Sequence, residues 1–428
     1  DADPGSAKII MGNLSPKKLK QNLFYNCIHE FSWGLGIAFH STYAVIPLFL
    51  KKLGAPDAVI ISIAGLFSIL LAFPMLFSAA LGRNILNIKK AVIVSHTIVL
   101  PPVLIAGFIF AFFAPTGPYA WVYYYVCFIF YSLALGVIIP IWTEFLSHVF
   151  PRANRGHYLG ISFAFNSVGG FIGGIFVKIL LTSSVAFPNN FGWGFIIMGC
   201  SILAGTLVFL LFNIDTKPAD TPHKTIADFW KDTKAIIQTH KNFRYYLFSR
   251  IFITAHFPAM SLYAVYTQDL FGFDISQAGV FTVLQVITFG IGSVSSGKIG
   301  DRWGHKTAIT LSFCGYLLAI ICTVFASSMF YVYAIFLCLG LGNGGFMPSA
   351  MNMVYEFAET RDSKTYMALI DTFLAPFILL MVVMASFLNP LIGTRNLFMV
   401  LGALMFVGLI LLTFWVKEPH HRPYKVDG

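Results

Sequence analysis

The sequence predicts an all-α polytopic membrane protein with twelve transmembrane helices in two related six-helix bundles. Of its 428 residues, 57% are hydrophobic and only 11% are charged, whereas a soluble domain carries about 25% charged residues. Many apolar runs reach roughly 20 residues, the length at which a helix crosses a bilayer core of ~30 Å. The runs are continuous and do not alternate with polar residues, which favours helices over a β-barrel.

The twelve predicted spans are separated by short polar loops, with one long exception in the middle of the chain. They cover residues 22–50, 57–83, 90–113, 119–149, 156–182, 191–213, 243–270, 275–298, 305–326, 329–357, 364–389 and 394–416. The exception, 214–242, contains "KTIADFWKDTKAIIQTHKN", whose apolar residues recur on one helical face and predict an amphipathic helix at the membrane surface. The chain therefore divides into a short N-terminal segment, a first bundle, a linker, a second bundle and a tail: 1–21, 22–213, 214–242, 243–416 and 417–428.

The basic residues predict the orientation of the chain. Of the 28 Lys and Arg, 23 fall on the side of the N-terminus, and only Lys51, Lys52 and Arg395 fall on the other side. Such a bias places the basic loops in the cytoplasm. We therefore expect a multi-pass protein of the cell (inner) membrane with both termini cytoplasmic. The net charge of +10 is explained by topology, so we expect no nucleic-acid partner.

The two predicted bundles resemble each other in sequence. "YAV" at 43–45 recurs at 263–265, and with that offset of 220 Glu30 falls on Arg250. "LALG" at 133–136 is echoed by "LGLG" at 339–342, and Tyr158 is matched by Tyr366. Together these matches indicate a duplicated six-helix unit.

The stretch "GKIGDRWGHK" (297–306) is a cluster of charged residues between two apolar spans. Its pattern, G-x-x-x-D-R-x-G-x-K, is formed by Gly297, Asp301, Arg302, Gly304 and Lys306. It resembles the signature that members of the major facilitator superfamily carry between the second and third helices of a six-helix half. The resemblance covers the whole chain and implies a secondary transporter in which this motif stabilises the state closed toward the cytoplasm.

The chain also departs from that family pattern. At the matching place in the first half it has "LGRNILNIKK" (81–90), which lacks the acidic residue and the second glycine. The fourth span, with "YSLALGVIIP" (131–140), lacks the arginine pattern of many proton-driven drug exporters of the family. The first departure implies that the chain relies on the second-half motif, and the second argues against a drug–proton antiporter.

Four of the ionisable residues within the predicted spans, where charges are costly and usually functional, are candidates for a functional role. Glu30, Glu144, Arg250 and Asp371 each lie ~9–12 Å from the cytoplasmic end of their span at ~1.5 Å per residue. We expect them to act in coupling or gating. Because Glu30 and Arg250 are repeat-equivalent and opposite in charge, we expect them to pair when the cytoplasmic side is closed; a static structural pair is the alternative.

A second group of polar and aromatic residues lies nearer the predicted midplane. They are expected to line a substrate cavity, with His256 as the strongest single contact for substrate or proton. The set is Trp33, His40, Tyr43, Asn166, His256, Tyr263, Gln285 and Asn343.

These features predict a secondary active transporter for a small organic solute that works by alternating access and is coupled to protons. No nucleotide-binding loop, C-x-x-C pair or nucleophile–base pair stands out, so we expect no cofactor, no metal site and no enzymatic activity. The expected partners are a small-molecule substrate, protons and the lipid bilayer, and the expected state is a monomer. The alternatives left open are a carrier for metal ions or amphipathic lipids on the same fold, or a membrane sensor without transport.

Overall fold

The computed structural model describes residues 14–81, 87–151, 155–214, 226–358 and 363–419, and its regular elements there are all helices. The N-terminal half contains α1 (Pro16–Ile37), η1 (Ala38–His40), α2 (Val45–Lys52), α3 (Asp57–Leu81), α4 (Ile88–Thr97), α5 (Leu100–Phe108), η3 (Ile109–Phe113), α6 (Ala120–Val149), α7 (Arg155–Thr182), α8 (Asn189–Leu207) and η5 (Val208–Leu211). The C-terminal half contains α9 (Ile226–Thr239), α10 (Lys241–Ile253), α11 (His256–Phe271), α12 (Gln277–Trp303), α13 (His305–Val324), α14 (Met329–Ala358), α15 (Ser363–Ile392) and α16 (Thr394–Trp415).

These helices confirm the predicted two-bundle membrane fold, but several of the predicted spans are interrupted. Eleven helical segments of the described residues are long and apolar enough to cross a membrane. The predicted seventh span, 243–270, is instead divided into α10 and α11. Pro258 lies in the first turn of α11, and a proline ring clashes with the carbonyl four residues earlier, here that of Thr254, where the helix breaks. The first span is likewise broken, between α1 and α2.

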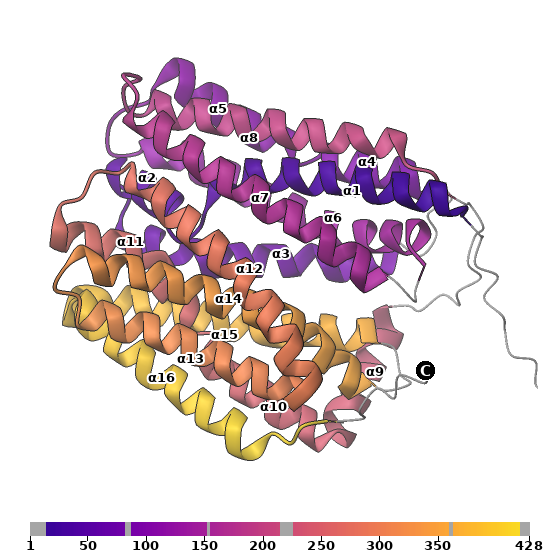
Figure 1. Cartoon of the computed structure of the whole chain (residues 1–428). Coiled ribbons are helices and arrows are strands. Elements are labelled where there is room, and N and C mark those ends of the chain that lie inside the picture. The colour runs from indigo at the N-terminus through magenta and orange to yellow at the C-terminus, as the bar shows by residue number, and fades with distance from the viewer. Residues whose placement is uncertain (1–13, 82–86, 152–154, 215–225, 359–362, 420–428) are drawn as a thin grey trace, which may run out of the picture.

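The two halves lie side by side, as Figure 1 shows with the N-terminal half in indigo to pink and the C-terminal half in salmon to yellow. The main contacts between them are those of α7 with α12 and of α3 with α15 and α11. We call the end where α1 begins and α16 ends the basic end, since Lys17, Lys18, Lys20 and Lys417 lie there. The other end is called the opposite end.

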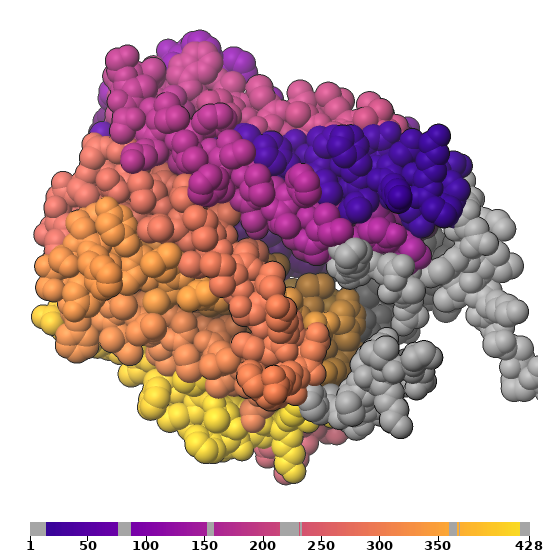
Figure 2. All heavy atoms as spheres, in the orientation of Figure 1, coloured from indigo at the N-terminus to yellow at the C-terminus, as the bar shows by residue number. Residues whose placement is uncertain are grey.

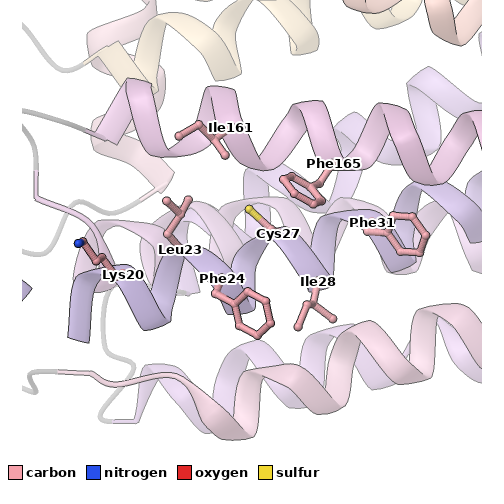
Figure 3. Close-up of a pocket in the computed structure, with 8 residues that line it drawn as sticks. All are labelled: Lys20, Leu23, Phe24, Cys27, Ile28, Phe31, Ile161 and Phe165. Carbon is pink, nitrogen blue, oxygen red and sulfur yellow. The ribbon is translucent and has the colours of Figure 1, made fainter. Parts of the chain in front are cut away.

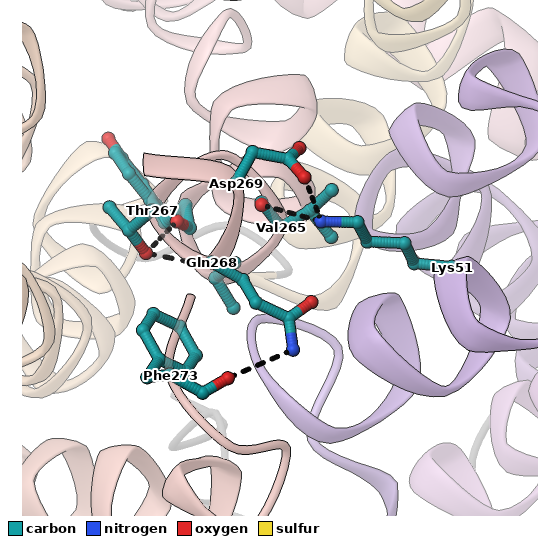
Figure 4. Close-up of polar contacts among 8 residues, drawn as sticks. Lys51, Val265, Thr267, Gln268, Asp269 and Phe273 are labelled. Carbon is teal, nitrogen blue, oxygen red and sulfur yellow. Dashed lines mark hydrogen bonds and ion pairs between the residues drawn. The ribbon is translucent and has the colours of Figure 1, made fainter. Parts of the chain in front are cut away.

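The halves are closed against each other at the opposite end. Lys51 on α2 makes an ion pair with Asp269 on α11 and also donates to the carbonyl oxygen of Val265 (Figure 4). Asn389 on α15 donates to Asp57 on α3 at 3.0 Å. These contacts seal the opposite end by pairing polar groups from both halves.

The halves separate toward the basic end. A Cβ added to Gly279, near the start of α12, would lie 2.5 Å from the carbonyl oxygen of Gly174 on α7, so the two backbones touch there. At the basic ends of the same helices, Gly160 on α7 and Gly297 on α12 have open space beside them. Figure 2 shows a hollow between the magenta and orange surfaces on this side. The hollow between the halves is therefore open at the basic end and closed at the opposite end.

The predicted linker helix forms as α9. Ile236 is buried where α9 lies against α10 and α15 of the C-terminal half. The preceding part of the linker, 215–225, lies outside the described residues, and the membrane-surface location of α9 stays a prediction.

Candidate functional site

Glu30 is the most buried of the four predicted coupling residues. It lies on α1 with 4% of its surface exposed, and the side-chain nitrogen of Asn166 on α7 donates to its Oε2 at 3.0 Å. Within the described residues no cation pairs with Glu30. The structure thus brings together two of the predicted residues, and an ionised carboxylate there would be a buried charge without a counter-ion.

Glu30 and Arg250 do not pair in this open conformation. Arg250, on α10 of the other half, donates from Nη1 to the hydroxyl oxygen of Tyr246 at 3.0 Å. Its guanidinium lies 4.5 Å from the ring centroid of Phe346, and its Nε is buried without a hydrogen-bond partner. The predicted pair belongs to the state closed at the basic end, so this structure does not test it.

Arg250 belongs to a polar layer inside the C-terminal half. Its charge lies within electrostatic range of Asp371, His256 and Tyr316. The imidazole of His256 stacks on Tyr316 at 4.9 Å between centroids, and the Tyr316 hydroxyl donates to Asn343 at 2.7 Å. The side chain of Asp371 is exposed, although α15 lies at the junction of the halves. This layer therefore gathers a guanidinium, a carboxylate and an imidazole within the C-terminal half.

Tyr43 and Gln285 connect the two halves. The Tyr43 hydroxyl donates to Gln285 Oε1 at 2.8 Å, and nearby Ser41 and Thr282 are hydrogen-bonded at 3.4 Å. These bonds join the break between α1 and α2 to the middle of α12. They form part of the closed side of the hollow.

Three predicted cavity residues lie inside a half in this conformation. The ring of His40 stacks on Phe128 and its Nε2 is hydrogen-bonded to the Tyr124 hydroxyl at 2.8 Å. Trp33 is buried, and its Nε1 has no hydrogen-bond partner. Tyr263 is buried and stacks on Phe398. Any contact of these residues with a solute requires rearrangement from the present state.

The charged motif lies at the basic end, as predicted. Asp301 and Arg302 are exposed at the end of α12, and Gly304 takes a positive φ of 92° in the turn before α13. The Lys306 backbone N–H donates to both carboxylate oxygens of Glu418 at 3.1 and 3.2 Å, and Lys306 Nζ donates to the carbonyl oxygen of Thr413 at 2.7 Å. The motif is thus hydrogen-bonded to the end of α16 within its own half. Glu144 lies on α6, where its Oε1 is 4.0 Å from Nδ1 of His148.

Sequence reasoning missed Glu418 and the sealing contacts of the opposite end. In the sequence, Glu418 is only an acidic residue after the last span. In the structure, its carboxylate accepts a hydrogen bond from the Lys306 backbone N–H in the first turn of α13. Lys51 and Asp57 are the charged residues that flank the first loop of the opposite end. That location alone did not identify Asp269 and Asn389 as their partners.

The described residues contain no group of three or more His, Cys, Asp or Glu side chains placed to hold a metal ion. The polar chemistry between the halves instead comes from single charged residues and hydrogen-bonding side chains.

Comparisons with known proteins agree on one family. A model of the Major Facilitator Superfamily matches residues 23–265 and 243–427. The niacin transporter NiaP of Acinetobacter baylyi is 25% identical over 152 residues, which are 36% of this chain and 34% of that protein. The probable anion transporter 3 of Arabidopsis thaliana is 25% identical over 271 residues, which are 54% of this chain and 50% of that protein. The chain thus spans half or less of these curated relatives.

Solved structures show the same fold. The nucleoside transporter NupG superposes with a TM-score of 0.72 at 13% identity, covering 93% of this chain and all of that chain. FucP in its outward conformation superposes with a TM-score of 0.63 at 12% identity, covering 94% of this chain and all of that chain. At these identities the likeness shows the fold alone.

Proposed function

The chain belongs to the major facilitator superfamily, and from this premise we propose a secondary active transporter that moves a small organic solute by alternating access, coupled to protons. We take the basic end as cytoplasmic because of its excess of Lys and Arg. The present conformation is then inward-open. Closing the basic end and breaking the contacts of Lys51, Asp57 and Tyr43 with the other half would give the outward-open state.

The observation that carries proton coupling is the hydrogen bond from Asn166 to Glu30. Glu30 is buried in an apolar span without a counter-ion among the described residues, and an uncompensated charge in such a place costs several kcal/mol. A proton on Glu30 removes that cost. Asn166 lies on α7, which packs on α12 of the other half. A change in the protonation of Glu30 would therefore alter a hydrogen bond to a helix at the junction of the halves.

The arrangement of Arg250 supports an anionic group on the solute. Its guanidinium lies over the ring of Phe346, and its buried Nε has no hydrogen-bond partner. Guanidinium groups bind carboxylates and phosphates well. Relatives named for niacin and for anions support the same class. The carboxylate of Asp371 lies in electrostatic range of Arg250, so an anionic group of the solute would compete with it for the guanidinium.

The charged motif would stabilise the outward-open state, in which the basic end is closed. Asp301 is exposed at the basic end in the open conformation. When the basic ends of the two halves approach, its carboxylate can meet basic residues of the N-terminal half, which stabilises the closed form.

The test uses purified protein in proteoliposomes that contain a pH-sensitive dye. Pools of small organic acids, neutral metabolites and cations are added outside, and uptake and internal pH are followed together. We expect organic-acid uptake with acidification in the wild type and in Asp274→Asn, an exposed loop carboxylate that serves as the matched control. We expect no pH change with Glu30→Gln. Equal uptake without any pH change in all three proteins would mean a uniporter with a structural Glu30.

A further inference from the structure

A narrow apolar groove runs along the outer face of the N-terminal half, away from the hollow between the halves. α1 lies recessed between α7 and α8 and forms its floor, while Ile161 and Phe165 of α7 form one wall (Figure 3). Phe24, Ile28 and Phe31 of α1 also line the groove, whose volume is about 430 Å³. The α1 surface is visible in indigo on the outside of the molecule in Figure 2.

The groove exists because α1 and α7 splay apart from a point of close contact. A Cβ on Gly34 would overlap the carbonyl oxygen of Asn166, and one on Gly169 would overlap that of Phe31, so the backbones touch there. Toward the basic end, the positions where α1 faces α7 carry phenylalanine and isoleucine side chains instead of glycines, and these larger side chains hold the helices apart. The resulting wedge is open to the surroundings, since 62% of the Phe24 surface and 46% of the Phe165 surface are exposed.

The length of the groove matches one leaflet of a bilayer. It begins at Lys20 and ends at Phe31 on the same helix, and eleven residues of α-helix rise ~16 Å. Half of a hydrocarbon core of ~30 Å is ~15 Å. The groove thus reaches from the membrane surface to the midplane, as one acyl chain of a phospholipid does.

The entrance of the groove is basic. Lys20 lines it, is exposed, and makes no hydrogen bond or ion pair with another described residue. Lys17 and Lys18 lie in the first turn of the same helix. An ammonium group at a membrane surface attracts anionic headgroups and binds phosphate by charge-assisted hydrogen bonds.

We propose that this groove binds one anionic phospholipid, with an acyl chain against Phe24, Ile28 and Phe165 and the headgroup phosphate on Lys20. The inner end of the acyl chain lies beside Phe31 and Phe165. These are the sequence neighbours of Glu30 and Asn166, whose side chains are hydrogen-bonded at 3.0 Å. An occupied groove supports the spacing of α1 and α7 around that bond.

The binding site does not depend on the proposed transport activity and is tested without it. The full chain is reconstituted in phosphatidylcholine vesicles that contain a trace of phosphatidylglycerol or phosphatidylcholine with a photoreactive group at the end of one acyl chain. After illumination, the labelled residues are mapped by mass spectrometry. We expect phosphatidylglycerol to label the region of Phe31 and Phe165 more strongly than phosphatidylcholine does.

Variants distinguish a built site from ordinary boundary lipid. Lys20→Gln should lower phosphatidylglycerol labelling in the groove about fivefold, whereas Lys17→Gln, a neighbour that does not line the groove, should lower it less than twofold. Ile28→Trp should fill the groove and reduce labelling by both lipids. Equal labelling by the two lipids that Lys20→Gln leaves unchanged, or labelling spread evenly over the outer helices, would overturn the proposal.

Discussion

The contact between Gly174 and Gly279 allows the closed opposite end to be destabilised selectively. In Gly279→Ala, the new methyl group would lie 2.5 Å from the Gly174 carbonyl oxygen and 2.5 Å from the Lys178 backbone nitrogen, so α7 and α12 must move apart. Overpacking of this kind costs about 1–3 kcal/mol. In the outward-open state α7 and α12 are separated at the opposite end, so the added methyl group does not destabilise that state. The population ratio of outward-open to inward-open protein should therefore rise about 5-fold to 150-fold.

Thiol labelling measures this shift. Thr282 is buried behind the closed end on α12, and Thr282→Cys in a background without native cysteines reports opening to a charged maleimide added outside the cell. Gly290→Ala on the same helix is the control, because its methyl group would meet only the Ser167 hydroxyl oxygen at 3.9 Å. A labelling rate of Gly279→Ala equal to that of Gly290→Ala would refute the reasoning that this contact closes the opposite end.

The remaining predictions concern single contacts. Asn166→Leu removes the donor to Glu30 and should abolish substrate-driven pH change in the proteoliposome assay; unchanged acidification would contradict the role of this bond. Lys51→Met removes an ion pair whose acidic partner is exposed, and exposed pairs contribute about 0–1 kcal/mol, so Thr282→Cys labelling should rise at most about fivefold. Gly34→Ala should lower the stability of the detergent-solubilised protein by about 1–3 kcal/mol in thermal melts, whereas Gly160→Ala, beside open space, should not. Tyr316→Phe should cost about 1 kcal/mol in the same melts, because it loses the Asn343 bond while the ring can still stack on His256.

The sequence was sufficient for the fold because the bilayer leaves few alternatives. Apolar runs of bilayer length must be helices, and the charges between them specify sides. The repeat offset of 220 indicated a duplicated unit, and the structure adds that the first span of each half is broken near its middle. The break of the seventh span was missed, although Pro258 marks it.

The site was predicted only in part, because side-chain partners depend on which faces of the helices meet. Asn166 and Glu30 were singled out separately as polar residues in apolar spans, but only the packing of α1 on α7 shows that they are bonded. Gln285 and Tyr43 were likewise named without their mutual bond. The sealing pairs at the opposite end were missed because each joins segments more than 200 residues apart.

Alternating access is the central claim, and spin-label distances at both ends test it most directly. One protein carries labels at Tyr119 and Phe330, which are exposed on the two halves at the opposite end; a second carries them at Lys17 and Lys298, which are exposed at the basic end. We predict two distance populations at each end, with Gly279→Ala shifting them in opposite directions. A basic end that stays open while the opposite end never opens, in any variant and with any solute pool, would contradict transport and favour a sensor.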